Sequence, residues 1–131
     1  MPSLDKNQRI LVVDDDRDIL ANLSDILTEI GYQTDTAPCG EDALKLINES
    51  CSGASPTTYD LCLLDFNMPG MDGVELYEQI QNHYPNLPAI MITAYAGDDG
   101  IERARLAGTC EVLRKPVEIK ELLAMIAKAI S

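Results

Sequence analysis

The sequence predicts an α/β fold built on a parallel sheet of five strands. Short extended runs, most of them apolar, alternate along the chain with longer segments whose apolar residues recur at helical spacing. This alternation is typical of parallel strands joined by crossover helices, and such sheets are covered by helices on both faces. At 131 residues the chain is long enough for one domain with a buried core. We therefore expect a layered domain in which the carboxyl ends of the strands lie at one edge.

The expected elements follow one another from residue 8 to residue 130, so one domain covers residues 1–131 and leaves no second, output domain in the chain. Gly31 ends the first helix, and Gly100 makes the fourth helix the weakest. The small polar stretch 51–58 indicates a surface loop. The expected strands cover residues 9–14, 32–36, 60–65, 89–93 and 110–114. The expected helices cover residues 19–30, 41–50, 74–83, 101–107 and 119–130.

The composition excludes several classes of function. The net charge is −12, from 22 acidic and 10 basic residues, and it repels nucleic acid and anionic membranes. The first apolar run covers only residues 10–13, which is too short for a signal peptide or a membrane span. We expect a cytoplasmic protein that binds neither nucleic acid nor membrane directly. No CxxC pair or Cys/His zinc pattern is present, so reduced structural thiols are expected at Cys39, Cys51, Cys62 and Cys110.

Three aspartates follow two of the expected strands. Asp14 and Asp15 come after the first strand, and Asp65 ends the third. If these strands are neighbours, the carboxylates repel one another and raise one another's pKa unless a hard cation binds. Mg²⁺ suits such a group, because it takes one or two carboxylates, a carbonyl, waters and a phosphate oxygen. Asp16 and Asp18 instead fit the start of a helix.

A carboxylate can also act as a nucleophile toward phosphorus and form an acyl phosphate. This chemistry requires a metal to offset the phosphoryl charge and donors for the remaining phosphoryl oxygens. Thr93 follows the fourth apolar run and Lys115 follows the fifth, so a hydroxyl and an ammonium are available at the same edge. The polar residues at the ends of the first, third, fourth and fifth runs together predict a phosphoryl-transfer site.

With these residues the chain resembles the receiver domains of two-component response regulators. The resemblance implies a doubly wound, flavodoxin-like (βα)₅ fold with strand order 2-1-3-4-5 and helices on both faces. Each motif alone is weak, but their order and spacing are highly specific. The segments that match are residues 10–16, 60–73, 88–95 and 115–116.

The resemblance also assigns the site. Asp65 would accept a phosphoryl group from the phosphohistidine of a histidine kinase or a phosphotransfer protein. Asp15 and Asp65 would bind Mg²⁺ directly, together with the main-chain carbonyl of Asn67, and Asp14 would act mainly through water. Mn²⁺ could substitute for Mg²⁺. Enzymatic activity would be limited to the domain's own phosphorylation and dephosphorylation.

Thr93 and Lys115 would contact the phosphoryl oxygens, and a cis peptide before Pro116 would direct the lysine toward the site. Phosphorylation would then switch a surface near the fourth helix, fifth strand and fifth helix that binds a downstream protein or output domain. The same surface would allow a phosphorylation-dependent dimer, although no residue pattern requires one. A stand-alone regulator and a receiver within a longer protein both fit.

One position departs from the family pattern. Receivers commonly carry Tyr or Phe three residues before the lysine, where this chain has Val112. Because valine is short and stiff at χ1, it cannot make the ring movement that accompanies activation. We expect the switch to depend instead on the loop after Thr93 and on the fourth helix. By resemblance, Asn67 and Tyr95 would tune the lifetime of the acyl phosphate.

Two other functions compete with this interpretation. Asp14 and Asp16 after an apolar strand resemble the nucleophile motif of haloacid-dehalogenase-type phosphatases, in which Asp14 would be the nucleophile. The second alternative is a receiver-like module that binds partners without being phosphorylated. Such a module is expected to lack some of the site residues, whereas this chain keeps every one.

Overall fold

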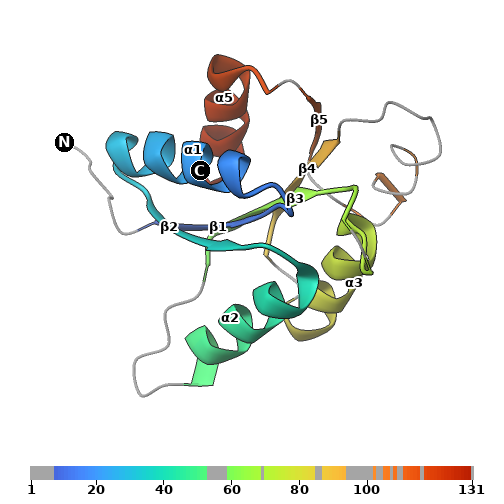
Figure 1. The fold of residues 1–131 in the computed structure, drawn as a ribbon. Helices are drawn as coiled ribbons and strands as arrows, with labels where there is room; N and C mark the ends of the chain where they lie inside the picture. The colour runs from blue at the N-terminus through green and yellow to red at the C-terminus, as the bar shows by residue number, and fades with distance from the viewer. Residues whose placement is uncertain are drawn as a thin grey trace.

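The computed structural model contains a five-stranded parallel sheet with strand order β2-β1-β3-β4-β5 (Figure 1). It describes residues 8–52, 59–68, 70–84, 87–93, 102, 105–106, 108, 111–115 and 117–130. The strands are β1 (Arg9–Val13), β2 (Gln33–Ala37), β3 (Leu61–Asp65), β4 (Ala89–Thr93) and β5 (Glu111–Arg114). The helices are α1 (Arg17–Ile30), α2 (Gly40–Ser52), α3 (Gly73–His83) and α5 (Ile119–Ile130). The predicted fold class and strand order are confirmed.

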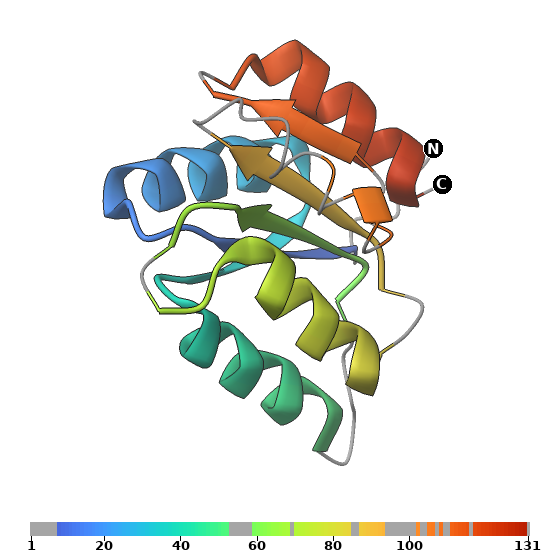
Figure 2. The same cartoon turned by 90° about the vertical axis from the view of Figure 1, so that its right-hand side faces the viewer.

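Helices cover both faces of the sheet, α1 and α5 on one and α2 and α3 on the other (Figures 1 and 2). Successive side chains of a strand point to opposite faces, so each central strand contributes to two cores. In β3, Leu61 and Leu63 pack with α1 and α5, whereas Cys62 and Leu64 pack with α2 and α3. This two-sided burial explains why the central strands are continuous apolar runs.

Two helix starts are fixed by aspartate side chains. The carboxylate of Asp16 accepts hydrogen bonds from the main-chain N–H groups of Asp18 and Ile19 and thereby caps α1. Asp72 caps α3 and forms a capping box with Glu75. The interpretation of Asp16 as a helix-start residue agrees with this geometry.

Some element boundaries differ from those predicted. The first strand ends at Val13, one residue before Asp14, and β2 begins and ends one residue later than expected. The helix predicted to end at residue 50 continues to Ser52, because neither Gly nor Pro interrupts the chain before residue 53. Of the expected fourth helix, residues 102, 105 and 106 are described and are helical. The remainder of that helix, residues 53–58 of the expected loop, and Cys110 lie outside the described residues.

The thiol of Cys62 is fully buried and unpaired, and burial raises its pKa to about 12. Cys39 is also a free thiol and is half-buried. Across the part of the chain that the structure describes, none of the helices combines the length and the apolar character that crossing a bilayer requires.

Candidate functional site

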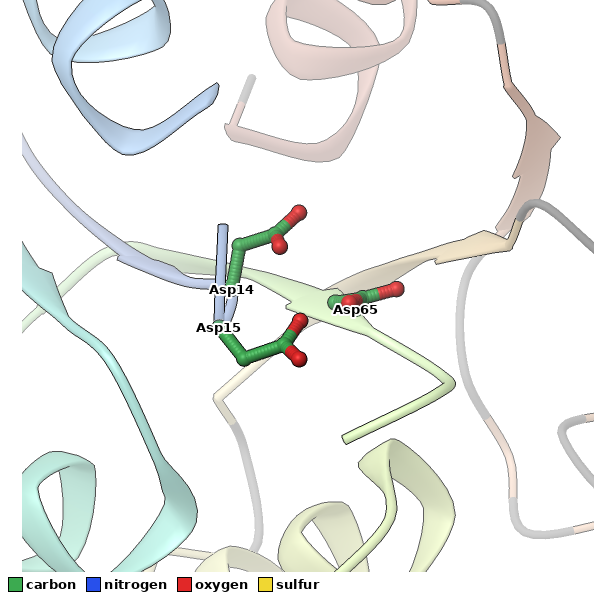
Figure 3. Close-up of side chains that lie close together, drawn as sticks. All are labelled: Asp14, Asp15 and Asp65. Atoms are coloured by element: carbon green, nitrogen blue, oxygen red, sulfur yellow. The ribbon is translucent and has the colours of Figure 1, made fainter. Parts of the chain in front are cut away.

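Three carboxylates meet at the carboxyl edge of the sheet (Figure 3). Val13 pairs with Leu64, so the residues that follow β1 lie beside the end of β3. One carboxylate oxygen each from Asp14, Asp15 and Asp65 lies within 4.8 Å of the others. Asp14 and Asp65 are buried, whereas Asp15 is exposed to solvent. The adjacency of β1 and β3 therefore brings together the three acids that the sequence singled out.

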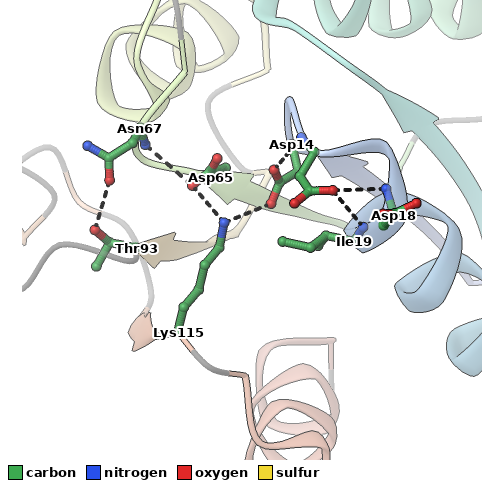
Figure 4. A network of polar contacts seen from close by, with 8 residues as sticks. Asp14, Asp18, Ile19, Asp65, Asn67, Thr93 and Lys115 are labelled. Carbon is green, nitrogen blue, oxygen red and sulfur yellow. Dashed lines mark hydrogen bonds and ion pairs between the residues drawn. The ribbon is translucent and has the colours of Figure 1, made fainter.

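The ammonium group of Lys115 lies between two of these carboxylates (Figure 4). Its Nζ is 3.2 Å from Asp14 Oδ2 and 3.4 Å from Asp65 Oδ1. The main-chain N–H of Lys115 donates to the carbonyl of Thr93 at 2.8 Å, which holds the chain in place directly after β5. Burial lowers the pKa of Lys115, but Asp65 and Asp14 outweigh this effect and hold the pKa above its usual value. The lysine is therefore cationic and offsets part of the acidic charge.

The carboxyl group of Asp65 has a raised pKa. Burial and the neighbouring Asp14 carboxylate raise its pKa from 3.8 to about 7, against the opposing effects of Lys115 and of the Asn67 N–H. The predicted mutual effect of the acids is thus present at Asp65, although burial is the larger cause. A cation bound here would offset the negative charge that Asp14 and Asp65 bring together.

Thr93 and Asn67 complete the same edge of the sheet. Asp65 pairs with Ile92, so Thr93 at the end of β4 lies beside the residues that leave β3. The Thr93 hydroxyl donates a hydrogen bond to Asn67 Oδ1 at 3.3 Å, and the Asn67 N–H donates to Asp65 Oδ1 at 3.3 Å (Figure 4). The structure therefore gathers at one edge every candidate site residue named above that it describes. Ala94, Tyr95 and Pro116, with the expected cis peptide, lie outside the described residues.

A family model for the response regulator receiver domain matches residues 10–127 of the chain. The chain belongs to this family. The match covers both cores and the whole carboxyl edge described above, from Asp14 through Asp65 and Thr93 to Lys115. The chain is therefore a receiver domain of two-component signalling, and the resemblance found in its sequence is confirmed.

Known receivers resemble this domain in sequence and structure. A response regulator receiver protein of Anaeromyxobacter is 39% identical over 116 residues, which cover 88% of this chain and 46% of that protein. The DNA-binding transcriptional regulator NtrC of Klebsiella pneumoniae is 37% identical over 120 residues, 92% of this chain and 24% of NtrC. A CheY-like receiver domain crystallised from Methanospirillum hungatei has a TM-score of 0.85 at 31% identity, covering 95% of this chain and 94% of that one. The chain thus spans less than half of these curated relatives.

The connection from β3 to α3 depends on Gly73 in this receiver. A Cβ atom at this position would lie 2.6 Å from the Asp65 carbonyl oxygen and 2.6 Å from Met91 Sδ. The N–H of Gly73 also donates to the Phe66 carbonyl at 3.0 Å. Only glycine therefore lets α3 begin directly behind the end of β3, which keeps the loop after Asp65 short and close to the sheet.

The structure adds two features that the sequence did not reveal. The first is the hydrogen bond between the Thr93 hydroxyl and the Asn67 side chain, since the sequence assigned Asn67 only a main-chain metal ligand and a role in tuning the lifetime of the acyl phosphate. The second is an apolar groove of about 740 Å³ that runs from Lys115 along α1. Its lining comes from two distant segments, so no local pattern could show it. The groove is lined by Ile19, Asn22, Leu23, Asp25, Ile26, Lys115, Val117 and Ile119.

Proposed function

We propose that this receiver accepts a phosphoryl group on Asp65 from a phosphohistidine, with Mg²⁺ held beside it. The observation that carries the proposal is the environment of one buried carboxylate. Asp65 lies with Asp14 and Asp15 in a cluster of potential ligands, and the Lys115 ammonium is 3.4 Å from its Oδ1. An acceptor carboxylate, a place for a cation and a fixed positive charge are the parts that phosphoryl transfer requires.

The donor set fits Mg²⁺. All three side chains offer hard oxygen ligands, and Asp15 is open to solvent, so a bound cation could keep several waters. Asp15, Asp65 and the Asn67 carbonyl would hold the ion directly, and Asp14 would act mainly through water. Mn²⁺ prefers the same oxygen ligands and could replace it. When bound, the cation neutralises charge on the phosphoryl oxygens.

The transfer itself uses the chain's own residues. A carboxylate oxygen of Asp65 attacks phosphorus, the new O–P bond forms, and the P–N bond to the donor imidazole breaks with its electron pair going to the imidazole nitrogen. The Lys115 ammonium compensates the phosphoryl charge, and the Thr93 hydroxyl donates to a phosphoryl oxygen after it turns from its resting partner. Water later cleaves the O–P bond, so the domain's activity is directed at itself.

Phosphorylation would convert this local charge into a change of surface near β5 and α5. Leu106, close in sequence to β5, is 81% exposed and supplies an apolar contact for a partner. With Val112 in place of an aromatic ring, the change would depend on Thr93 and the segment after it. The net charge of −12 favours a downstream protein, an output domain or a second receiver over nucleic acid as the direct partner.

We propose that the protein that carries the phosphohistidine binds in the groove beside α1. It begins at Lys115, next to the acceptor, and Ile19, Leu23 and Ile26 give it an apolar wall. An amphipathic helix that carries the donor histidine can bury its apolar face in such a groove. Docking there would bring the histidine to the carboxyl edge of the sheet.

The test of phosphorylation is intact mass after incubation with acetyl phosphate, with and without Mg²⁺. Wild type and Asp18→Asn, which changes an acid outside the cluster, are expected to gain one phosphoryl group in the presence of Mg²⁺. Asp65→Asn is expected to gain none. An adduct that persists in Asp65→Asn but disappears in Asp14→Asn, with turnover of phosphate esters, would establish the phosphatase alternative. Folded wild type that never gains an adduct would support the interaction module.

Docking is tested by comparing two phosphodonors. Ile26→Lys is expected to slow transfer from a phosphorylated histidine kinase domain by about tenfold or more, because it puts a charge on the apolar wall. The rate with acetyl phosphate should stay unchanged. Glu29→Gln makes the same change of net charge on the same helix outside the groove and serves as the control. Equal rates for Ile26→Lys and wild type with the kinase domain would exclude the groove as the docking site.

A further inference from the structure

The Thr93 hydroxyl is occupied in the resting structure. Thr93 is 3% exposed at the end of β4, and its hydroxyl donates to the side-chain carbonyl of Asn67 at 3.3 Å (Figure 4). Asn67 lies in the loop after β3, and the hydrogen bond joins residues 26 positions apart in the sequence. This hydrogen bond therefore bridges the carboxyl ends of β3 and β4 beside the carboxylate of Asp65.

A threonine hydroxyl has only one proton to donate. While that proton is bonded to Asn67 Oδ1, it cannot be bonded to a phosphoryl oxygen on Asp65. The two acceptors therefore compete for the same donor, and the resting bond must be given up when Thr93 turns to the phosphoryl group. The free energy of that bond is part of the cost of switching.

We propose that the Asn67 side chain is a positioning residue that holds Thr93 in its resting orientation and sets the cost of activating the switch. The inference rests on the proposed phosphorylation of Asp65. It assigns Asn67 two separable roles, since the main-chain carbonyl is a candidate metal ligand and the side-chain amide restrains the switch residue. Substitution of the side chain alone separates them.

The geometry of the contact indicates a modest restraint. Asn67 is exposed, and 3.3 Å is long for a bond donated by a hydroxyl group. The Asn67 N–H is held by Asp65 Oδ1, so the side chain can move while its main chain stays in place. A neutral bond of this kind changes an equilibrium by about two- to fivefold when it is removed. A weak restraint suits a switch that one local event must reverse.

The resting state can be tested without phosphorylation or metal. Three-bond couplings of the Thr93 methyl group report its χ1 angle by NMR. Wild type is expected to show one dominant rotamer, and Asn67→Ala an average over rotamers. Asn82→Ala removes the same side chain from an exposed position on α3 and should leave the couplings as in wild type. Unchanged couplings in Asn67→Ala would overturn the inference and leave the proposed function untouched.

The cost of switching is measured by titrating beryllofluoride with Mg²⁺. Asn67→Ala is expected to bind about two- to fivefold more tightly than wild type, because Thr93 no longer gives up its bond to Asn67. In a Thr93→Val background, Asn67→Ala should have no effect, which makes a double-mutant cycle decisive. An equal effect in both backgrounds would show that Asn67 acts by another route and would overturn the inference. Wild type that fails to bind beryllofluoride would overturn both this inference and the proposed function.

Discussion

Asp65 carries a large electrostatic cost in the metal-free protein. It is 3% exposed, and burial together with Asp14 raises its pKa from 3.8 to about 7. The folded protein therefore keeps a proton on Asp65 at pH values where the unfolded chain has lost it. The contribution of Asp65 to stability is most favourable below pH 4, decreases as the pH rises toward 7, and is lowest above pH 7. A site built for function thus lowers the stability of the empty domain.

The first prediction follows from the loss of stability that Asp65 causes at high pH. In EDTA at pH 8, Asp65→Asn is expected to raise the free energy of unfolding by about 1 kcal/mol or more, because the amide cannot carry the disfavoured charge. The difference from wild type should shrink as the pH is lowered from 8 to 5. Urea unfolding at several pH values measures it, with Asp18→Asn as the control. A stability difference that is constant across this pH range would contradict a raised pKa of Asp65 in the folded protein.

Asp15 should matter for cation binding more than for the empty fold, because its carboxylate is exposed. We expect Mg²⁺ to stabilise wild type by about 2.7 kcal/mol at a concentration 100 times its Kd. Asp15→Asn is expected to lose most of this stabilisation while its unfolding in EDTA stays close to that of wild type. Thermal unfolding with increasing Mg²⁺ measures both quantities. Full stabilisation of Asp15→Asn by the cation would exclude Asp15 as a ligand.

At the scale of elements, the connection from β3 to α3 links Asp65, the proposed phosphoacceptor, to the rest of the fold. Asp72 and Glu75 fix the start of α3, and Gly73 lets that start pack against the end of β3. The same loop contains Gly70, whose φ is +84°, and a Cβ atom there would meet no described atom within 4 Å beyond its chain neighbours. Gly73 is therefore favoured because space is short, and Gly70 is favoured because of its backbone conformation.

This difference gives the third prediction. Gly73→Ala is expected to cost about 1–3 kcal/mol in unfolding free energy, because the new methyl group must push back the carbonyl of Asp65. The displaced loop should also weaken Mg²⁺ binding. Gly70→Asn, which tolerates a positive φ, should change neither quantity by much. Urea unfolding and a Mg²⁺ titration test both, and a Gly73→Ala protein with wild-type values would show that the loop can relax.

At the scale of the molecule, the parts that stabilise the sheet and the parts that form the site lie apart. Arg9 at the start of β1 pairs with Asp35 of β2 at 2.6 Å, and the Tyr59 hydroxyl donates to the same carboxylate at 2.6 Å. The Arg9 guanidinium also lies 5.3 Å from the centre of the Tyr59 ring. Burial, then the contact with Asp35, raises the pKa of Tyr59. These three residues tie β1, β2 and the segment before β3 together.

Breaking this cluster should lower stability without affecting the site. Asp35→Ala is expected to cost about 1–2 kcal/mol, since it leaves a half-buried guanidinium and a hydroxyl without their shared acceptor. The Kd for Mg²⁺ should stay within about twofold of wild type, because independent sites contribute additively. Urea unfolding and Mg²⁺ titration of the same variant give both values. A large loss of Mg²⁺ affinity in the folded variant would show that the cluster and the site are coupled.

The sequence by itself determined the layers and much of the site. Runs such as residues 61–64 are apolar throughout because both of their faces are buried, and this predicts a central parallel strand. Asp14, Asp65 and Thr93 each stand at or just beyond the end of such a run, and Lys115 follows the short strand β5, in which only Val112 and Leu113 are apolar. Because parallel strands end at one edge, their grouping could be predicted before any distance was known.

Only the tertiary structure decided which of these groups touch. The Lys115 ammonium lies between Asp14 and Asp65, and Thr93 donates to Asn67 across two strands. The pKa of Asp65 depends on burial by the complete fold, and the groove beside α1 is formed by segments about 90 residues apart. Local patterns record which face a residue occupies. Contacts between distant side chains depend on strand order, register and packing, which exist only once the whole chain has folded.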